Sequence, residues 1–407
     1  MASTMTFDYS VRDRSGNVVR GKLTAESQAA VAARLRSQGF APVSIKKTGS
    51  GLQKELSIPG FGKRVTLKDL AIMSRQFATM INSGLSLLRA LDILSSQTEN
   101  QELARVLTAV RSDIESGVSL STAMAKHPHA FPPLFVSMTR AGEVGGFLDG
   151  VLLQIAENYE AEVKLRGKIK SAMTYPVVVF VIALLAVVGM LLFVVPVFAH
   201  MFDDLGGELP APTKALVFLS SALKFAAPAL VVAFLAWALS WGKVKNKPQV
   251  RNVLDPLKLK LPIFGKLAQK IALSRFTRNL GTMMRSGVPI LQSLEIVGAT
   301  AGNVVLQRAV TDVQDAVRRG ESLARPLERH SVFPAMVVQM LVVGEDTGAL
   351  DTMLHKISDF YDQEVEATAE ALTSLIEPLM IAVLGGVIGS MIIALYMPIF
   401  GVFNLIQ

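Results

Sequence analysis

The sequence predicts a mainly α-helical membrane protein with two homologous antiparallel helical bundles, three transmembrane helices and a small α+β N-terminal unit. Three observations support this fold class. A set of turn motifs occurs twice, each copy leads into a long apolar segment without charge, and apolar residues elsewhere recur at helical spacing. The chain of 407 residues is 51% hydrophobic and 18% charged, as expected for soluble domains joined to a few membrane spans.

The predicted segments follow from turn signals, changes in charge and the ends of each apolar run. In chain order we expect a small α+β unit (1–47), a linker (48–65), a first cytoplasmic helical bundle (66–172), a first transmembrane helix (173–199), a short extracytoplasmic connector (200–214), a second transmembrane helix (215–241), a basic cytoplasmic linker (242–265), a second cytoplasmic bundle (266–375) and a third transmembrane helix (376–403).

The N-terminal unit begins with an alternating pattern. Phe7, Tyr9 and Val11 alternate with polar residues, which is typical of a strand. The segment 25–37 then carries alanines and a leucine at helical spacing. Strands packed with one helix are expected here, followed by a linker rich in proline and glycine.

A helical pattern begins at Thr66. Thr66 and Asp69 have the spacing of a capping box, and the apolar residues from Leu67 to Ile81 form one stripe. Turn signals divide the segment 66–172 into about six helices with short connections, which indicates an antiparallel bundle. The last of these helices continues into the first apolar run.

The turn motifs of the first bundle recur in the second. The offset is 203 residues as far as His127 and His330, and 202 residues after that, so one deletion near a Phe-Pro step explains the change of register. The repeated positions, interpreted as structural turns, are Gly84, Gly117, Gly142, Glu143, Gly146 and Asp149 in the first copy and Gly287, Gly320, Gly344, Glu345, Gly348 and Asp351 in the second.

The strongest local motif is the run from Ala141 to Asp149, which is echoed at 343–351. We interpret it as architectural: its glycines end one helix, and Glu143 or Asp149 caps the next helix at its positive N-terminus. The alternative is a site for a divalent cation or a partner, because oxygen ligands suit calcium. Glu143 is the candidate metal ligand under that alternative.

Three apolar segments are long enough to cross a bilayer. No charged residue occurs between Ser171 and Ala199, the second segment is interrupted only by Lys224, and the segment from Pro378 onward is uncharged. Buried helices of a soluble protein are the alternative for each segment. The length and purity of the apolar runs favour transmembrane helices.

Loop charge predicts the orientation of these spans. Four basic residues lie between 164 and 170, and a lysine-rich run follows the second span, whereas the connector carries Asp203, Asp204 and Glu208 without a basic residue. The positive-inside rule therefore places the N-terminus and both bundles in the cytoplasm.

The formal net charge is +8, and the chain has no cysteine. The basic residues cluster beside apolar spans without interleaved aromatic residues, so we expect contact with the lipid bilayer and not with nucleic acid. Docking of an acidic partner on the basic run is the other interpretation of this charge. The lack of cysteine excludes disulfides, thiolate metal sites and cysteine nucleophiles.

The sequence shows no catalytic constellation. The glycine cluster at 142–146 lacks the lysine of a phosphate-binding loop, and His127 and His129 flank a proline at a turn, where capping or packing is the usual role. We therefore expect no enzymatic activity and no cofactor.

The doubled Ser-Gly turn, the Gly-x-Ser-Leu and Phe-Pro steps and the Gly-Glu-x-x-Gly-x-Leu-Asp turn, together with three spans, resemble the bacterial inner-membrane platform family of type IV pilus assembly and type II secretion. The resemblance covers nearly the whole chain. It implies a scaffold in the inner membrane whose partners are a cytoplasmic hexameric ATPase, pilin subunits, other inner-membrane assembly proteins and further copies of itself. Some relatives hold a metal near the Gly-Glu turn, which corresponds to Glu143 here.

We predict the platform of a pilus machine, which couples the ATPase to pilin extraction and polymerisation. The equivalent type II secretion platform is the alternative, because the motifs above do not separate the two systems. A small-solute transporter and a membrane-bound enzyme are rival interpretations. A transporter predicts charged groups at mid-bilayer, and an enzyme predicts a cluster of acid, base or nucleophile. The sequence shows neither pattern.

Overall fold

The computed structural model describes residues 5–12, 18–25, 28–37, 41–47, 64–204, 209–244, 247–262 and 264–402. The chain divides into two compact units between Arg64 and Val65. Most of the linker predicted at 48–65 lies outside the described residues.

The first unit is a three-stranded antiparallel sheet with one helix. The strand order is β2-β1-β3, and Tyr9 of the central strand lies opposite Gly21 and Ile45. Val31 and Leu35 of the helix are buried. The elements are β1 (Met5–Arg12), β2 (Val18–Ala25), α1 (Gln28–Ser37) and β3 (Ala41–Lys47).

The second unit contains the two repeats, each built from six helices, and the predicted mainly α-helical fold is confirmed. In the first repeat the helices are α2 (Leu67–Asn82), α3 (Leu87–Gln97), α4 (Gln101–Glu115), α5 (Leu120–Ala125), α6 (Pro133–Gly145) and α7 (Leu148–Gly189). Their counterparts are α11 (Phe264–Arg285), α12 (Ile290–Thr300), α13 (Val304–Arg318), α14 (Ala324–Leu327), α15 (Ala335–Thr347) and α16 (Leu350–Val402).

Local sequence explains where these helices begin. In the capping box of α2, the Asp69 N–H donates to Thr66 Oγ1 at 3.2 Å and the Thr66 N–H donates to Asp69 Oδ2 at 2.9 Å. Asn100 accepts bonds from two backbone N–H groups at the start of α4. Such caps satisfy backbone donors that have no partner inside the helix.

The apolar faces of both repeats meet in one continuous core. Phe77, Phe135 and Leu107 from the first repeat belong to the same cluster as Phe276 and Leu354 from the second. The amphipathic stripes of the sequence therefore bury their apolar side chains in a core that both repeats share.

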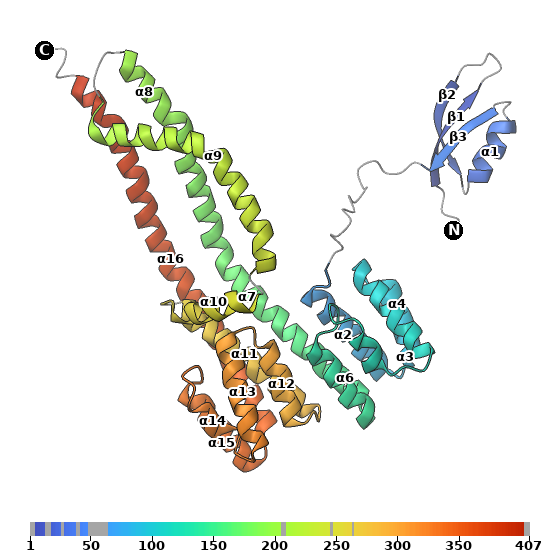
Figure 1. Ribbon diagram of the computed structural model, residues 1–407. Coiled ribbons are helices and arrows are strands. Elements are labelled where there is room, and N and C mark those ends of the chain that lie inside the picture. The colour runs from blue at the N-terminus through green and yellow to red at the C-terminus, as the bar shows by residue number, and fades with distance from the viewer. Residues whose placement is uncertain are drawn as a thin grey trace. The chain divides into compact units, whose positions relative to one another are not determined.

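Among the described residues, three helical segments are long and apolar enough to cross a membrane, as predicted. They are Leu148–Asp204, Ala211–Gly242 and Leu350–Pro398. In Figure 1, α7 and α16 continue from the bundles into the spans without a break. The apolar side chains of the spans, such as Phe225 at 85% and Ile381 at 69%, are widely exposed, as contact with lipid requires.

The first span differs from its predicted bounds. After α7, a short π-helical segment (Met190–Val194) leads into α8 (Val195–Asp204), so the helix passes the predicted end at residue 199. The reason is that apolar residues continue at helical spacing, with Phe202 buried. The following helix, α9 (Ala211–Val244), also begins earlier than expected, which shortens the connector.

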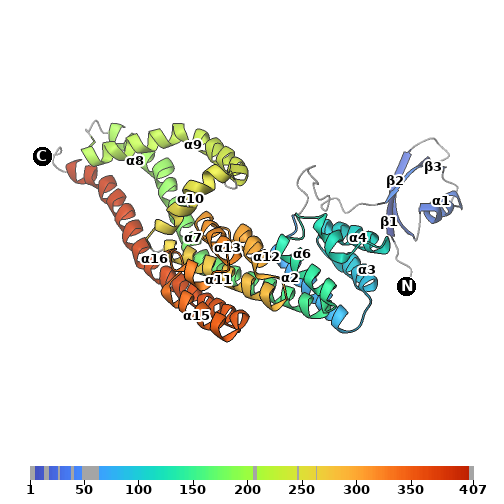
Figure 2. The same cartoon turned by 60° about the horizontal axis from the view of Figure 1, so that its bottom comes forward.

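The basic segment 242–265 contains a helix where a linker was predicted. This helix, α10 (Pro248–Lys260), starts with a proline in its first turn, a position that a helix tolerates. Packing of α10 against the second repeat supplies the stability that its sequence alone does not signal. Figure 2 shows α10 close to the helices of that repeat.

Gly84 and Gly287 should resist substitution. Both have positive φ, 83° and 72°, which disfavours any residue with a Cβ. We expect Gly84→Ala to lower the free energy of unfolding by about 1–2 kcal/mol, although the added methyl meets open space. The measurement is thermal unfolding of the full chain in detergent.

The matched control is Gly150→Ala. Gly150 lies inside α7, and a Cβ there also meets no atom within 4 Å. Because its backbone is helical, alanine should stabilise by up to about 1 kcal/mol. Equal effects of the two substitutions would contradict the role of the positive φ.

Candidate functional site

The repeated turn residues occupy equivalent places in the two repeats. Gly142 and Gly344 lie where consecutive helices touch: a Cβ on Gly142 would lie 2.9 Å from the Val151 side chain, and one on Gly344 would lie 3.1 Å from Met353. Asp149 and Asp351 stand in the first turns of α7 and α16. The remaining predicted glycines have positive φ: Gly117, Gly146, Gly320 and Gly348.

Glu143 caps a helix, but not the one expected. Its carboxylate accepts hydrogen bonds from the Leu120 N–H at 2.6 Å, the Ser121 N–H at 3.1 Å and the Ser121 hydroxyl at 2.7 Å. It therefore reaches back to the start of α5, and the prediction that it caps the next helix is wrong. The cause is the fold of the bundle, which brings the positive N-terminus of α5 beside the last turn of α6, where Glu143 lies.

The second repeat forms the same contact. Glu345 accepts from the Leu323 N–H and, at 3.1 Å, from the Ala324 N–H. Each repeat thus ties two helices together through one carboxylate. Among the described residues, no group of three or more histidine, aspartate or glutamate side chains is placed to hold a metal ion. The cation site suggested for Glu143 stays a prediction.

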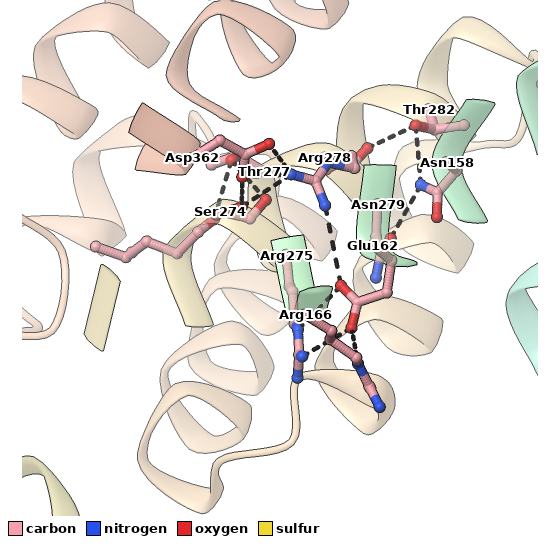
Figure 3. A network of polar contacts seen from close by, with 11 residues as sticks. Asn158, Glu162, Arg166, Ser274, Arg275, Thr277, Arg278, Asn279, Thr282 and Asp362 are labelled. Atoms are coloured by element: carbon pink, nitrogen blue, oxygen red, sulfur yellow. Dashed lines mark hydrogen bonds and ion pairs between the residues drawn. The ribbon is translucent and has the colours of Figure 1, made fainter. Parts of the chain in front are cut away.

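A second polar feature joins the repeats to each other. Arg278 of α11 lies between two carboxylates: its Nη2 donates to Asp362 of α16, and its Nη1 is 3.9 Å from Glu162 of α7 (Figure 3). The Arg278 side chain is only 6% exposed. Ser274 also donates to Asp362, at 2.5 Å. One guanidinium therefore links three long helices.

Glu162 is the contribution of the first repeat to this cluster. Its carboxylate is 2.7 Å from Arg275 Nη2 on α11 and 2.6 Å from Arg166 Nε on its own helix. Burial lowers the pKa of Arg275, while the charge of Glu162 acts in the opposite direction. Two arginines of the second repeat and one carboxylate of the first thus form a partly buried ionic contact.

Amides and hydroxyls extend the contact along α7. The Asn158 amide donates to Asn279 Oδ1 at 3.1 Å and to Thr282 Oγ1 at 3.2 Å. One turn earlier, Ser286 donates to Gln154 at 2.5 Å. We call this set the inter-repeat network; its members are Gln154, Asn158, Glu162, Ser274, Arg275, Arg278, Asn279, Thr282, Ser286 and Asp362.

The first repeat holds a counterpart of the buried pair. Arg75 and Glu160 correspond to Arg278 and Asp362 by the same offsets of 203 and 202 residues. Arg75 donates twice to Glu160, at 2.7 and 2.6 Å, and this bond raises the pKa of Arg75. The two side chains are 39% and 42% exposed, because no other repeat covers them.

The sequence prediction missed the inter-repeat network, although a signal was present. An arginine and an acidic residue recur at the repeat offset, outside the turn motifs that define the duplication. Chemically, the network holds amides, hydroxyls and paired ions. Such groups fix helices against one another.

Replacement of the buried Arg278 should lower the free energy of unfolding far more than replacement of its exposed counterpart, Arg75. Arg278→Leu leaves the carboxylate of Asp362 without its charged partner, so we expect a loss of about 3–5 kcal/mol of stability. Arg75→Leu should cost about 1 kcal/mol or less, because water solvates the freed Glu160. Thermal unfolding of both full-length variants measures the difference; equal shifts would show that burial does not govern the pair.

The capping carboxylates of Glu143 and Glu345 should also contribute measurably to the free energy of unfolding. Glu143→Gln and Glu345→Gln remove the charge from bonds to backbone N–H groups, with an expected cost of about 1–3 kcal/mol each. Glu115→Gln is the control, since Glu115 pairs with Arg111 on the surface and should contribute at most about 1 kcal/mol. A stabilising shift on addition of calcium, lost in Glu143→Gln, would instead support the cation site.

Comparison with known proteins matches this architecture. The family model described as type II secretion system (T2SS), protein F covers residues 73–196 and 276–398, and that of its N-terminal domain covers 1–46. The two central matches coincide with the two repeats and their spans.

Relatives match over nearly the full length. The chain is 43% identical over 405 residues to the type IV pilus assembly protein PilC of Myxococcus xanthus, covering 100% of this chain and 97% of the relative. It is 44% identical to PilC of Thermus thermophilus, covering 97% of each, and 32% identical to type II secretion system protein F of Vibrio cholerae, covering 98% and 99%. The chain therefore belongs to the type II secretion system protein F family, the inner-membrane platform proteins of type IV pilus and type II secretion systems.

Proposed function

We propose that this chain is the platform protein of a type IV pilus assembly machine. The observation that carries the proposal is sequence identity. The chain is 43% and 44% identical to relatives named as pilus assembly proteins, and 32% identical to the Vibrio cholerae relative named for type II secretion. The corresponding platform of a type II secretion system is the second candidate, because that relative still matches along 98% of the chain.

The proposed task is to couple a cytoplasmic hexameric ATPase to pilin subunits in the membrane. Two features of the structure support it. Each repeat continues as one helix into a span, so a displacement of a bundle reaches the bilayer through a continuous element of 42 residues in α7 and 53 in α16. The inter-repeat network links these helices, so the repeats move together.

The proposed orientation places the N-terminus and both bundles in the cytoplasm. Basic residues beside the bundles support it, whereas the connector on the other side carries Asp203 and Asp204. Because the chain lacks cysteine, a single cysteine at the exposed Val144 can report the topology. Labelling of that cysteine in intact cells by a reagent that cannot cross the inner membrane would contradict this orientation.

The proposed role is that of a scaffold and not of an enzyme. Its partners are the ATPase, pilin, other inner-membrane assembly proteins and further copies of the chain. Affinity purification of the full chain from its own cells should co-isolate the ATPase and a pilin. Isolation of neither partner, under conditions that preserve the membrane complex, would contradict the coupling role.

Deletion of the gene distinguishes the two candidate systems. We expect the deletion strain to lose surface pili, counted by electron microscopy, while the amounts of proteins secreted through the outer membrane stay unchanged. Expression of the parent chain should restore pili. Loss of secreted proteins with normal piliation would replace the pilus assignment with the secretion platform.

A further inference from the structure

Helix α10 presents an uncovered apolar face. Val253, Leu257 and Leu261 lie at successive intervals of four residues and are 67%, 54% and 47% exposed. Phe264, at the start of α11, is 46% exposed and extends the row. Four exposed large apolar side chains between 253 and 264, beside a membrane span, differ from the isolated exposed apolar residues that any protein surface carries.

The opposite face of α10 is fixed to the second repeat. Asp255 is 3% exposed and accepts a bond from the Val304 N–H at 3.2 Å, at the start of α13. Arg251 and Lys258 flank the same carboxylate at 3.5 and 3.1 Å. These contacts determine which side of α10 faces outward, so the apolar row cannot turn inward without breaking them.

The turn after α10 is equally constrained. The Gly265 N–H donates to Leu261 O at 2.8 Å, and a Cβ on Gly265 would lie 2.2 Å from Leu259 O. The end of α10 therefore lies directly against the beginning of α11. Leu261 and Phe264, both exposed, flank this fixed turn.

Helix α10 lies close to the level at which the uncharged segments of the membrane spans begin. Leu267, near the start of α11, packs with Leu165 of α7 and Leu372 of α16. Each of those two residues lies less than two helical turns before the uncharged part of its span begins, at Ser171 and Pro378. In Figure 1, α10 lies across the long helices at this level, between the spans and the second bundle.

The surrounding charge is basic. Lys247, Lys258, Lys260 and Lys266 are exposed, and the only acidic residue between 243 and 270 is the buried Asp255. An apolar row flanked by lysines, on a helix joined to a membrane span, has the chemistry of a helix that lies in the bilayer interface and attracts anionic lipid.

We propose that α10 and the turn after it form an interfacial anchor that binds the anionic surface of the bilayer. Val253, Leu257, Leu261 and Phe264 enter the boundary between headgroups and acyl chains. Lys247, Lys260 and Lys266 contact lipid phosphates. Through Asp255 and α13, the anchor holds the second repeat against the membrane. This inference concerns lipid alone and holds for a pilus platform and a secretion platform alike.

The depth of a spin label tests the anchor in the full chain. Val253→Cys carries the label, and Val144→Cys is the matched control, an 84% exposed valine of the first repeat. In proteoliposomes of phosphatidylcholine with phosphatidylglycerol, collisions of the Val253 label with oxygen should exceed those with a water-soluble nickel complex several-fold. The Val144 label should favour nickel.

Two results would overturn the proposal. A Val253 label as accessible to nickel as the Val144 label would place α10 in water, and a label shielded from both reagents would show that protein covers the face. Thermal unfolding equal to that of the parent verifies that each labelled variant is folded.

Charge is tested separately with Lys260→Gln combined with Lys266→Gln. This variant should bring the Val253 label closer to water in vesicles that contain phosphatidylglycerol, while labels in pure phosphatidylcholine stay unchanged. An identical depth in parent and variant in the anionic vesicles would contradict the role of the lysines.

Discussion

The contact of Arg278 with Asp362 and Glu162 is the interaction on which the arrangement of the two repeats depends. It brings α7, α11 and α16 together at a point where a charge is removed from water. A buried guanidinium is unfavourable unless carboxylates lie close to it, so the packing of the three helices must keep Asp362 and Glu162 beside Arg278. Apolar packing around Leu165 and Leu372 stabilises the helices nearer the membrane, but such packing does not depend on direction as the ion pairs do.

The features that could be predicted from the sequence are those that short segments determine. Gly84 and Gly287 end helices because a positive φ favours residues without a Cβ, and that requirement is visible in the chain itself. The three transmembrane helices could also be predicted from the sequence, because uncharged apolar segments of this length have few other stable environments. The duplication then predicted two similar bundles.

Contacts between distant segments could not be predicted in the same way. Glu143 bonds to residues 22 and 23 positions earlier, so its partner depends on how α5 and α6 pack and not on neighbouring sequence. The segment that contains α10 has proline at both 248 and 256 and many lysines, a composition that suggested a linker. Tertiary contacts, such as the bonds that Asp255 and Asn252 accept from α13, stabilise the helix.

Because both repeats belong to one chain, equivalent positions in them can hold different residues. In a homodimer every substitution appears on both partners, so a contact surface must suit two environments at once. Here Arg275 meets Glu162, whereas the corresponding position of the first repeat holds Ile72, which is 49% exposed. The same helix surface therefore forms the internal junction in the second repeat, whereas in the first repeat it is left exposed.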